Sequence, residues 1–109
     1  MDDQKRRRKR VYRRLHDEVV SILYRHDPVG IGITIGGPPN EYEPEAGSIL
    51  TRLQGVSTVA ELSAILREEF VRWFDEYLAG PVETYQPIAE EILVAMRQHA
   101  ETATGQKGP

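Results

Sequence analysis

Apolar side chains recur every three or four residues in the first part of the chain, as they do along one face of a helix. Asp27 and Pro28 end this recurrence, because a residue that precedes proline is disfavoured in the helical conformation. We therefore predict a first helix from about residue 5 to about residue 26. Its apolar face consists of Val11, Leu15, Val19, Ile22 and Leu23.

The second predicted helix is short and covers about residues 44–54. Pro44 suits the first helical turn, because a backbone N–H would have no helical partner there. Gly55 follows the apolar stripe, and acidic residues stand where the helix dipole is positive. The stripe is Ile49, Leu50 and Leu53, and the acidic residues are Glu43 and Glu45.

The third predicted helix has the clearest ends. Thr58 can form a capping box with Glu61, and Gly80 and Pro81 close the helix in the order usual for helix ends. An aromatic stripe along this helix predicts that it lies at the centre of the core, with a partner-binding groove as the alternative. The stripe holds Phe70, Trp73, Phe74 and Tyr77.

Glu69 lies in the same row of this helix as Ile65 and Trp73. A carboxylate in that row is expected to be partly desolvated and to have a raised pKa, which can mark a functional acid. The alternative is a boundary residue that reaches for water. No second acid or base is placed to work with Glu69, which favours the alternative.

A fourth apolar stripe predicts a helix that begins near Tyr85, with Pro87 tolerated in its first turn. The stripe consists of Tyr85, Ile88, Ala89, Ile92, Leu93 and Met96. Together the four segments predict an all-α fold, a compact bundle of about four helices. We divide the chain into a basic arm at 1–10, a helical domain at 11–100 and a flexible tail at 101–109. Its 109 residues suffice for one domain with a single modest core.

The connection between the first two helices is rich in glycine and proline, which forbid a regular helix. Within it, isoleucine and small residues alternate over 31–36, which predicts one short strand. Such a strand must pair its backbone within the chain or with a second chain, including a second copy in a dimer. The alternative is a loop whose isoleucines plug the helical core. The candidate partner-binding residues of this loop are Ile31, Ile33, Ile35, Asn40, Glu41 and Tyr42.

The net charge of −3 conceals an uneven distribution. Residues 1–14 carry a net charge of +6, whereas the remaining 95 residues carry −9. Like charges at helical spacings next to the positive end of a helix oppose helix formation, so we expect a frayed arm unless anions neutralise it. The candidate polyanion-binding residues are Lys5, Arg6, Arg7, Arg8, Lys9, Arg10, Arg13 and Arg14.

Several kinds of chemistry are excluded or unsupported. Cysteine is absent, which excludes disulfides, thiol nucleophiles and cysteine-ligated metals. The phosphate-loop motif fails because Pro38 follows Gly37, and the dinucleotide motif fails because Ile35 stands where glycine is required. The three histidines lack zinc-site spacing, and the acidic residues after Asn40 lack the pattern of a calcium loop. We expect no catalytic residues, no cofactor and no metal.

Membrane insertion is also not expected. No apolar run reaches the eighteen or so residues that a membrane span requires, and the first residues are charged. We therefore expect a cytoplasmic protein with no membrane partner.

Two short motifs carry a resemblance to a known group. The run Asp27-Pro28-Val29-Gly30-Ile31 is followed by Asn40-Glu41-Tyr42 with Pro44 and Glu45 before the second helix. This arrangement resembles a group of small, uncharacterised bacterial helical proteins, a domain of unknown function, over about residues 11–95. The resemblance implies a bacterial cytoplasmic origin and a helical fold, and its motifs describe a turn and a helix start. The Arg-rich start and the Gly/Ile content of the loop depart from the group.

Two classes of function remain. The acidic body suits a protein-binding module, regulatory or immunity-like, because carboxylate surfaces steer and hold basic partners such as nuclease-type toxins. The basic arm suits weak, non-specific nucleic-acid binding through phosphate contacts. Tyr12 is the only aromatic residue among the basic residues 1–14, so stacking on single strands has little support from the sequence.

Overall fold

The computed structural model describes residues 2–104, and it describes the side chains of residues 3, 5–32 and 34–100. Over this range the chain forms five α-helices and two short 3-10 helices, with no strand among the described residues. The predicted all-α fold is confirmed, and the predicted short strand is wrong. Ile33–Ile35 form a 3-10 turn at that place.

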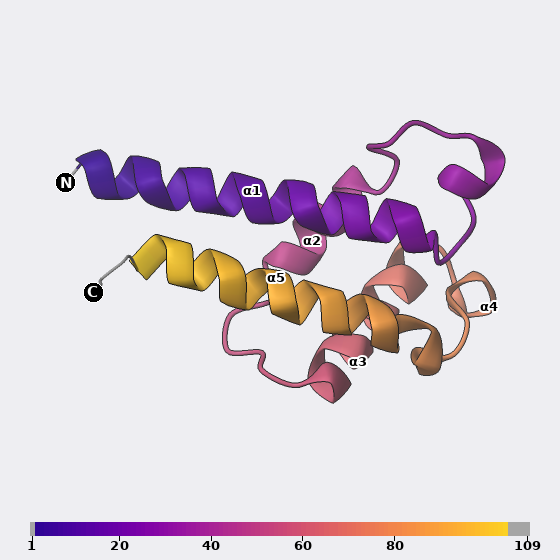
Figure 1. Cartoon of the computed structure of the whole chain (residues 1–109). Coiled ribbons are helices and arrows are strands. Elements are labelled where there is room, and N and C mark those ends of the chain that lie inside the picture. Colours follow the sequence, from indigo (N-terminus) through magenta and orange to yellow (C-terminus); the bar gives the residue numbers. More distant parts are fainter. Residues whose placement is uncertain (1, 105–109) are drawn as a thin grey trace.

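The two long helices run antiparallel and side by side, so that the first turn of one and the last turn of the other lie at the same end of the molecule (Figure 1). They are α1 (Asp2–His26) and α5 (Gln86–Thr104). His26 Nε2 lies 2.7 Å from the Glu91 carboxylate, and His99 Nε2 lies 2.9 Å from that of Glu18. These contacts join the two helices at two separated points.

The three shorter helices complete the bundle. They are α2 (Glu43–Leu50), α3 (Val59–Trp73) and α4 (Glu76–Ala79). α2 packs against α1 and α3, and α3 packs against α5. The core lies where these helices meet, and its central ring is Phe70, with the rings of Tyr42 and Tyr85 centred 5.8 Å and 5.6 Å away.

The helix ends test the sequence predictions closely. The capping box between Thr58 and Glu61 is present, which confirms the start of α3. Pro44 lies in the first turn of α2 as predicted, although α2 ends at Leu50, earlier than predicted. The arm continues α1 without a break from Asp2. α5 continues to Thr104, and residues 105–109 of the predicted tail lie outside the described residues.

The third predicted helix is wrong in its second half. α3 ends at Trp73, the chain bends at Phe74, and α4 begins again at Glu76. The prediction that Trp73 and Tyr77 belong to the core is therefore also wrong. Both side chains are exposed, whereas Phe70 and Phe74 stack on each other with ring centroids 5.9 Å apart.

This division of the aromatic residues predicts two different stability effects. Phe70→Ala removes a fully buried ring and should lower the free energy of unfolding by about 3 to 5 kcal/mol. Trp73→Ala removes a half-exposed ring and should cost about 1 to 2 kcal/mol. Urea denaturation of both variants measures the difference. Equal losses would place Trp73 in the core after all.

Candidate functional site

The junction between α3 and α4 is shaped by one capping residue. Asp75 has an extended backbone, and its Oδ1 accepts a hydrogen bond of 2.7 Å from the N–H of Leu78. An aspartate in this position starts a helix, because it satisfies a backbone donor that the first turn leaves without a partner. The chain therefore begins a new helix at Glu76 instead of extending α3.

The end of α3 and the new helix expose large apolar side chains to solvent. The exposed fraction is 45% for Trp73 and 91% for Tyr77, and Leu78 is also exposed. The exposed carboxylates of Asp75 and Glu76 lie between them in sequence. We call these five residues, Trp73, Asp75, Glu76, Tyr77 and Leu78, the α3–α4 surface.

Two hydrogen bonds attach the carboxyl end of α4 to the rest of the protein. Arg67 Nε donates to the backbone oxygen of Gly80 at 2.8 Å, and the Tyr85 hydroxyl donates to that of Ala79 at 2.6 Å. Tyr85 is fully buried, so its hydroxyl has a fixed position. These contacts satisfy carbonyl groups at the end of α4 and fix the α3–α4 surface in place.

The loop after α1 is organised around a second aspartate. Asp27 adopts a left-handed backbone conformation with φ of 50°, and its N–H donates to the backbone oxygen of Leu23 at 2.7 Å, which ends α1. Its carboxylate accepts hydrogen bonds from the backbone N–H groups of Gly32 and Thr34, each at 2.8 Å, and from the Tyr42 hydroxyl. A strand would need those N–H groups for its ladder, so the carboxylate explains why the loop forms none.

The surroundings of Asp27 leave no room for a larger residue at position 32. A Cβ atom on Gly32 would lie 3.0 Å from the Tyr24 ring, 3.2 Å from Asp27 Oδ1 and 3.2 Å from the Tyr42 ring. Burial raises the pKa of Asp27, but hydrogen bonds from Thr34, Tyr42 and Gly32 outweigh it and lower this pKa from 3.8 to about 2. Burial and the bond to Asp27 raise the pKa of Tyr42. At neutral pH the pair is an ionised carboxylate with a neutral phenol.

The predicted partner-binding loop is brought together only in part. Ile35 and Asn40 are exposed, and Ile31 and Glu41 are half-buried. Ile31 packs against the core, which agrees with the alternative of a plugging isoleucine, whereas the side chain of Ile33 lies outside the described residues. Tyr42 is fully buried, so its side chain is not available to a partner.

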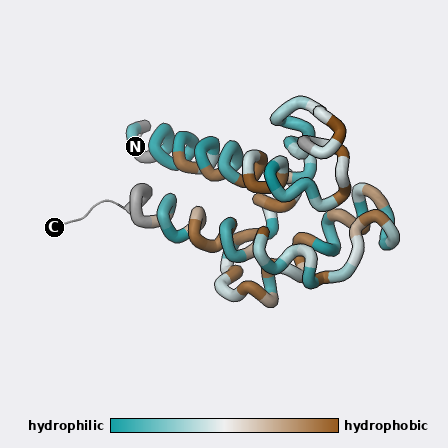
Figure 2. The backbone as a smooth tube through the Cα atoms, turned by 45° about the vertical axis from the view of Figure 1, so that its right-hand side comes forward, coloured by the Kyte–Doolittle hydropathy of each residue, from teal (hydrophilic) through white to brown (hydrophobic). Residues whose placement is uncertain are grey.

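The predicted polyanion-binding residues all lie exposed on α1, namely Lys5, Arg6, Arg7, Arg8, Lys9, Arg10, Arg13 and Arg14. Among the side chains that the structure describes, none of these eight forms an ion pair with a carboxylate. Figure 2 shows the amino-terminal half of α1 mostly in the colour of hydrophilic residues. The arm therefore presents its cations to solvent and does not fold back on the acidic body.

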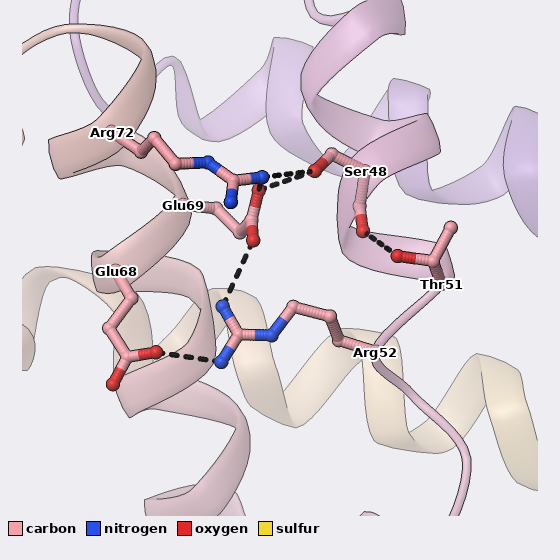
Figure 3. A network of polar contacts seen from close by, with 6 residues as sticks. All are labelled: Ser48, Thr51, Arg52, Glu68, Glu69 and Arg72. Atoms are coloured by element: carbon pink, nitrogen blue, oxygen red, sulfur yellow. Dashed lines mark hydrogen bonds and ion pairs between the residues drawn. The ribbon is translucent and has the colours of Figure 1, made fainter.

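Glu69 is the buried member of a network of polar contacts that joins α3 to α2 and to the segment after α2 (Figure 3). Only 1% of Glu69 is exposed, and its carboxylate accepts hydrogen bonds from Ser48 at 2.6 Å and from Arg52 at 2.9 Å. Arg72 contacts the same carboxylate at 3.5 Å, and Arg52 also reaches Glu68 at 2.7 Å.

The raised pKa predicted for Glu69 is wrong. Burial raises it, but the hydrogen bonds from Ser48 and Arg52 and the charges of Arg72 and Arg52 outweigh burial and lower the pKa. The expectation that the side chain reaches for water is also wrong, because its polar partners are protein groups. Both oxygens of the Glu69 carboxylate accept hydrogen bonds, and the bonds from Ser48 and Arg52 tie α3 to α2 and to the segment that follows α2.

Residues with metal-binding or acid–base chemistry are dispersed. His26 and His99 contact carboxylates on the facing long helix, and His16 lies 3.6 Å from Asp17 on its own helix. Within the described residues, no three histidine or acidic side chains are placed to hold a metal ion. Glu45 is buried, and one of its carboxylate oxygens lacks a hydrogen bond. Burial, and to a smaller extent the charge of Glu41, raises the pKa of Glu45.

Comparison with known proteins does not assign the chain to a family. No protein-family model, curated protein or solved structure matches the chain. None of the helices within residues 2–104 combines the length and the apolar character that crossing a membrane requires.

Two features of these sites escaped the sequence reasoning. The anchoring role of Asp27 was not predicted, although aspartate tolerates the left-handed conformation and precedes a run with four glycines, Gly30, Gly32, Gly36 and Gly37. The sequence offered a partner-binding groove only as the alternative for the aromatic stripe, and the bend that divides this stripe was not predicted. Asp75 was the available signal for it, because aspartate is a preferred N-cap residue inside an otherwise continuous apolar stripe.

The Asp27 contacts predict a pH-dependent contribution to stability. Because its pKa is lowered on folding, the contribution is present above about pH 4 and is lost as the pH falls toward 2. Asp27→Asn should therefore lower the free energy of unfolding by about 2 kcal/mol at pH 7. Below pH 4, the difference in free energy of unfolding between Asp27→Asn and the parent should become smaller.

Asp17→Asn is the matched control, because Asp17 is an exposed aspartate on α1. It should change the free energy of unfolding by no more than about 0.5 kcal/mol, both at pH 7 and at pH 3. Urea denaturation at several pH values measures both variants. A difference for Asp27→Asn that does not change between pH 7 and pH 3 contradicts the account.

Proposed function

We propose that this chain is a non-catalytic protein-binding module, regulatory or immunity-like, that docks a basic protein on the α3–α4 surface. The observation that carries this proposal is the exposure of Trp73 at the end of α3 and of Tyr77 on α4, a short helix whose carboxyl end is held by two hydrogen bonds. Tyrosine and tryptophan are enriched among the residues that dominate the binding energy of protein interfaces. Exposing both to water is unfavourable unless a partner covers them.

The charge around these rings favours a basic partner. Asp75 and Glu76 are exposed and lie between Trp73 and Tyr77 in sequence, and residues 15–109 carry a net charge of −9. Acidic rims of this kind accelerate the association of basic proteins and disfavour acidic ones. Fixing α4 before binding also reduces the entropy that association must overcome.

The proposal predicts that the aromatic anchors are required for capture of a partner. The full chain, used as bait in a lysate of its source organism, should retain a basic protein. This protein should be released more easily at high salt than at low salt. Trp73→Ala and Tyr77→Ala should each weaken binding of the purified partner about tenfold or more, because interface anchors contribute about 2 kcal/mol or more. Isothermal titration calorimetry measures these affinities.

Val94→Ala serves as the control, because Val94 is an exposed apolar residue on α5, outside the α3–α4 surface. It should bind the partner as the parent does. A partner that binds the parent and both aromatic variants equally contradicts this docking surface.

A second candidate function is nucleic-acid binding through the arm. The observation in its favour is the row of eight exposed basic side chains, for which no described carboxylate forms an ion pair. Cations of this kind bind phosphates without sequence preference and release counterions when they do so.

This second candidate predicts a steep salt dependence. The full chain should bind mixed-sequence DNA at low salt and lose affinity by orders of magnitude at physiological salt. A chain that lacks residues 1–10 should bind weakly at both. Fluorescence anisotropy measures the four affinities, and equal binding by the two chains contradicts a role for the arm.

A further inference from the structure

A groove of about 600 Å³ lies beside the amino-terminal half of α1. Its size falls within the range of about 300 to 1,000 Å³ that small-molecule sites occupy. Five of its described lining residues come from α1 and one from α2. They are Arg8, Lys9, Tyr12, Arg13, His16 and Gly47.

The helical spacing places one aromatic ring among cations. Arg8, Tyr12 and His16 are four residues apart and share one face of α1, and Lys9 and Arg13 lie on the adjoining row. The exposed fraction of Tyr12 is 52%, so the groove leaves about half of this residue accessible. The groove thus combines an accessible aromatic ring with three permanent positive charges.

Gly47 leaves the groove open on the side of α2. A Cβ atom at this position would meet no other atom within 4 Å, so no side chain of the described protein occupies that space. Glycine is an unfavourable residue inside a helix, and packing does not require it here. An unfilled space opposite an aromatic ring can admit a flat ligand.

We propose that this groove binds a base of single-stranded nucleic acid, with Tyr12 stacking on the base and Arg8, Lys9 and Arg13 contacting the adjacent phosphates. The inference rests on the second candidate function and extends it from a charged surface to a site of defined chemistry. Proteins that bind single strands combine a basic groove with aromatic side chains on which bases stack. The charge of the arm complements the phosphates.

Two competing polyanions fit the groove less well. The bases of a duplex are stacked inside the helix and cannot reach Tyr12, so a duplex would use the basic residues alone. An anionic membrane would be bound by a basic helix with large apolar side chains on its other face. The half of α1 that carries the cations offers only Val11 and Tyr12 for that purpose.

The test compares two probes that carry the same phosphates. One is a fluorescein-labelled 15-nucleotide strand of thymidine, and the other is an abasic strand of equal length. The parent chain should bind the thymidine strand about tenfold more tightly at low salt, because stacking on one aromatic residue contributes about that factor. Fluorescence anisotropy measures both dissociation constants.

Variants separate stacking from charge. Tyr12→Leu and Gly47→Leu should remove the preference for the thymidine strand and leave binding of the abasic strand unchanged. Tyr12→Phe keeps the ring and should retain the preference. Arg8→Gln combined with Arg13→Gln should weaken binding of both strands. Circular dichroism checks that each variant keeps its helices, and all four positions lie outside the buried core.

The outcomes distinguish the failure of this site from the failure of the arm. Equal affinity of the parent for both strands, or an unchanged preference in Tyr12→Leu, overturns the stacking site while nucleic-acid binding by the arm persists. No binding of either strand at low salt overturns both proposals. Binding to vesicles of anionic phospholipid, with none to either strand, also overturns both and identifies a membrane surface as the ligand of the arm.

Discussion

The hydrogen bond from the N–H of Leu78 to Asp75 Oδ1 starts a new helix where the apolar stripe of α3 would otherwise continue. In an uninterrupted helix, Trp73 and Tyr77 would follow the buried Glu69 in one row. Instead α3 ends at Trp73, which is half exposed, and the chain bends at Phe74, whose ring stacks on Phe70. The cap at Asp75 then starts α4, which places Tyr77 and Leu78 in solvent.

Two buried carboxylates fix the scaffold that holds this surface. Asp27 joins the end of α1 to the loop and to Tyr42, which contacts the central ring of Phe70. Glu69 joins α3 to α2 through Ser48 and to the segment after α2 through Arg52. In both cases hydrogen bonds outweigh burial and lower the pKa, so each group is ionised and satisfied at neutral pH. Asp27 and Glu69 thus stabilise the fold. The groups that a partner can reach are the α3–α4 surface and the cations of the arm.

Features that depend on residues close together in the sequence were predicted correctly. Features that depend on contacts between residues far apart in the sequence were not. The capping box of Thr58 and the apolar face of α1 follow from spacing alone, and both are correct. The strand at Ile31–Ile35 was predicted from alternation, but the Asp27 carboxylate takes the N–H groups that a strand would use.

The candidate site shows the same division between local and distant causes. The exposure of the arm cations follows from composition, because long charged side chains rarely find enough partners for burial. The exposure of Tyr77 depends on where the chain bends, and the end signal at Gly80 and Pro81 concealed the earlier bend at Phe74. The groove at Tyr12 depends on the placement of Gly47 from another helix, which no local pattern contains.

The central claim is that a basic partner covers the α3–α4 surface. The most direct test is an NMR titration of the isotope-labelled full chain with the purified partner that the chain captures. The account predicts that amide shifts change most strongly at residues 73–78 and little in the loop at 30–40 or in the arm. Shifts confined to the arm or to that loop, with residues 73–78 unchanged, would contradict it.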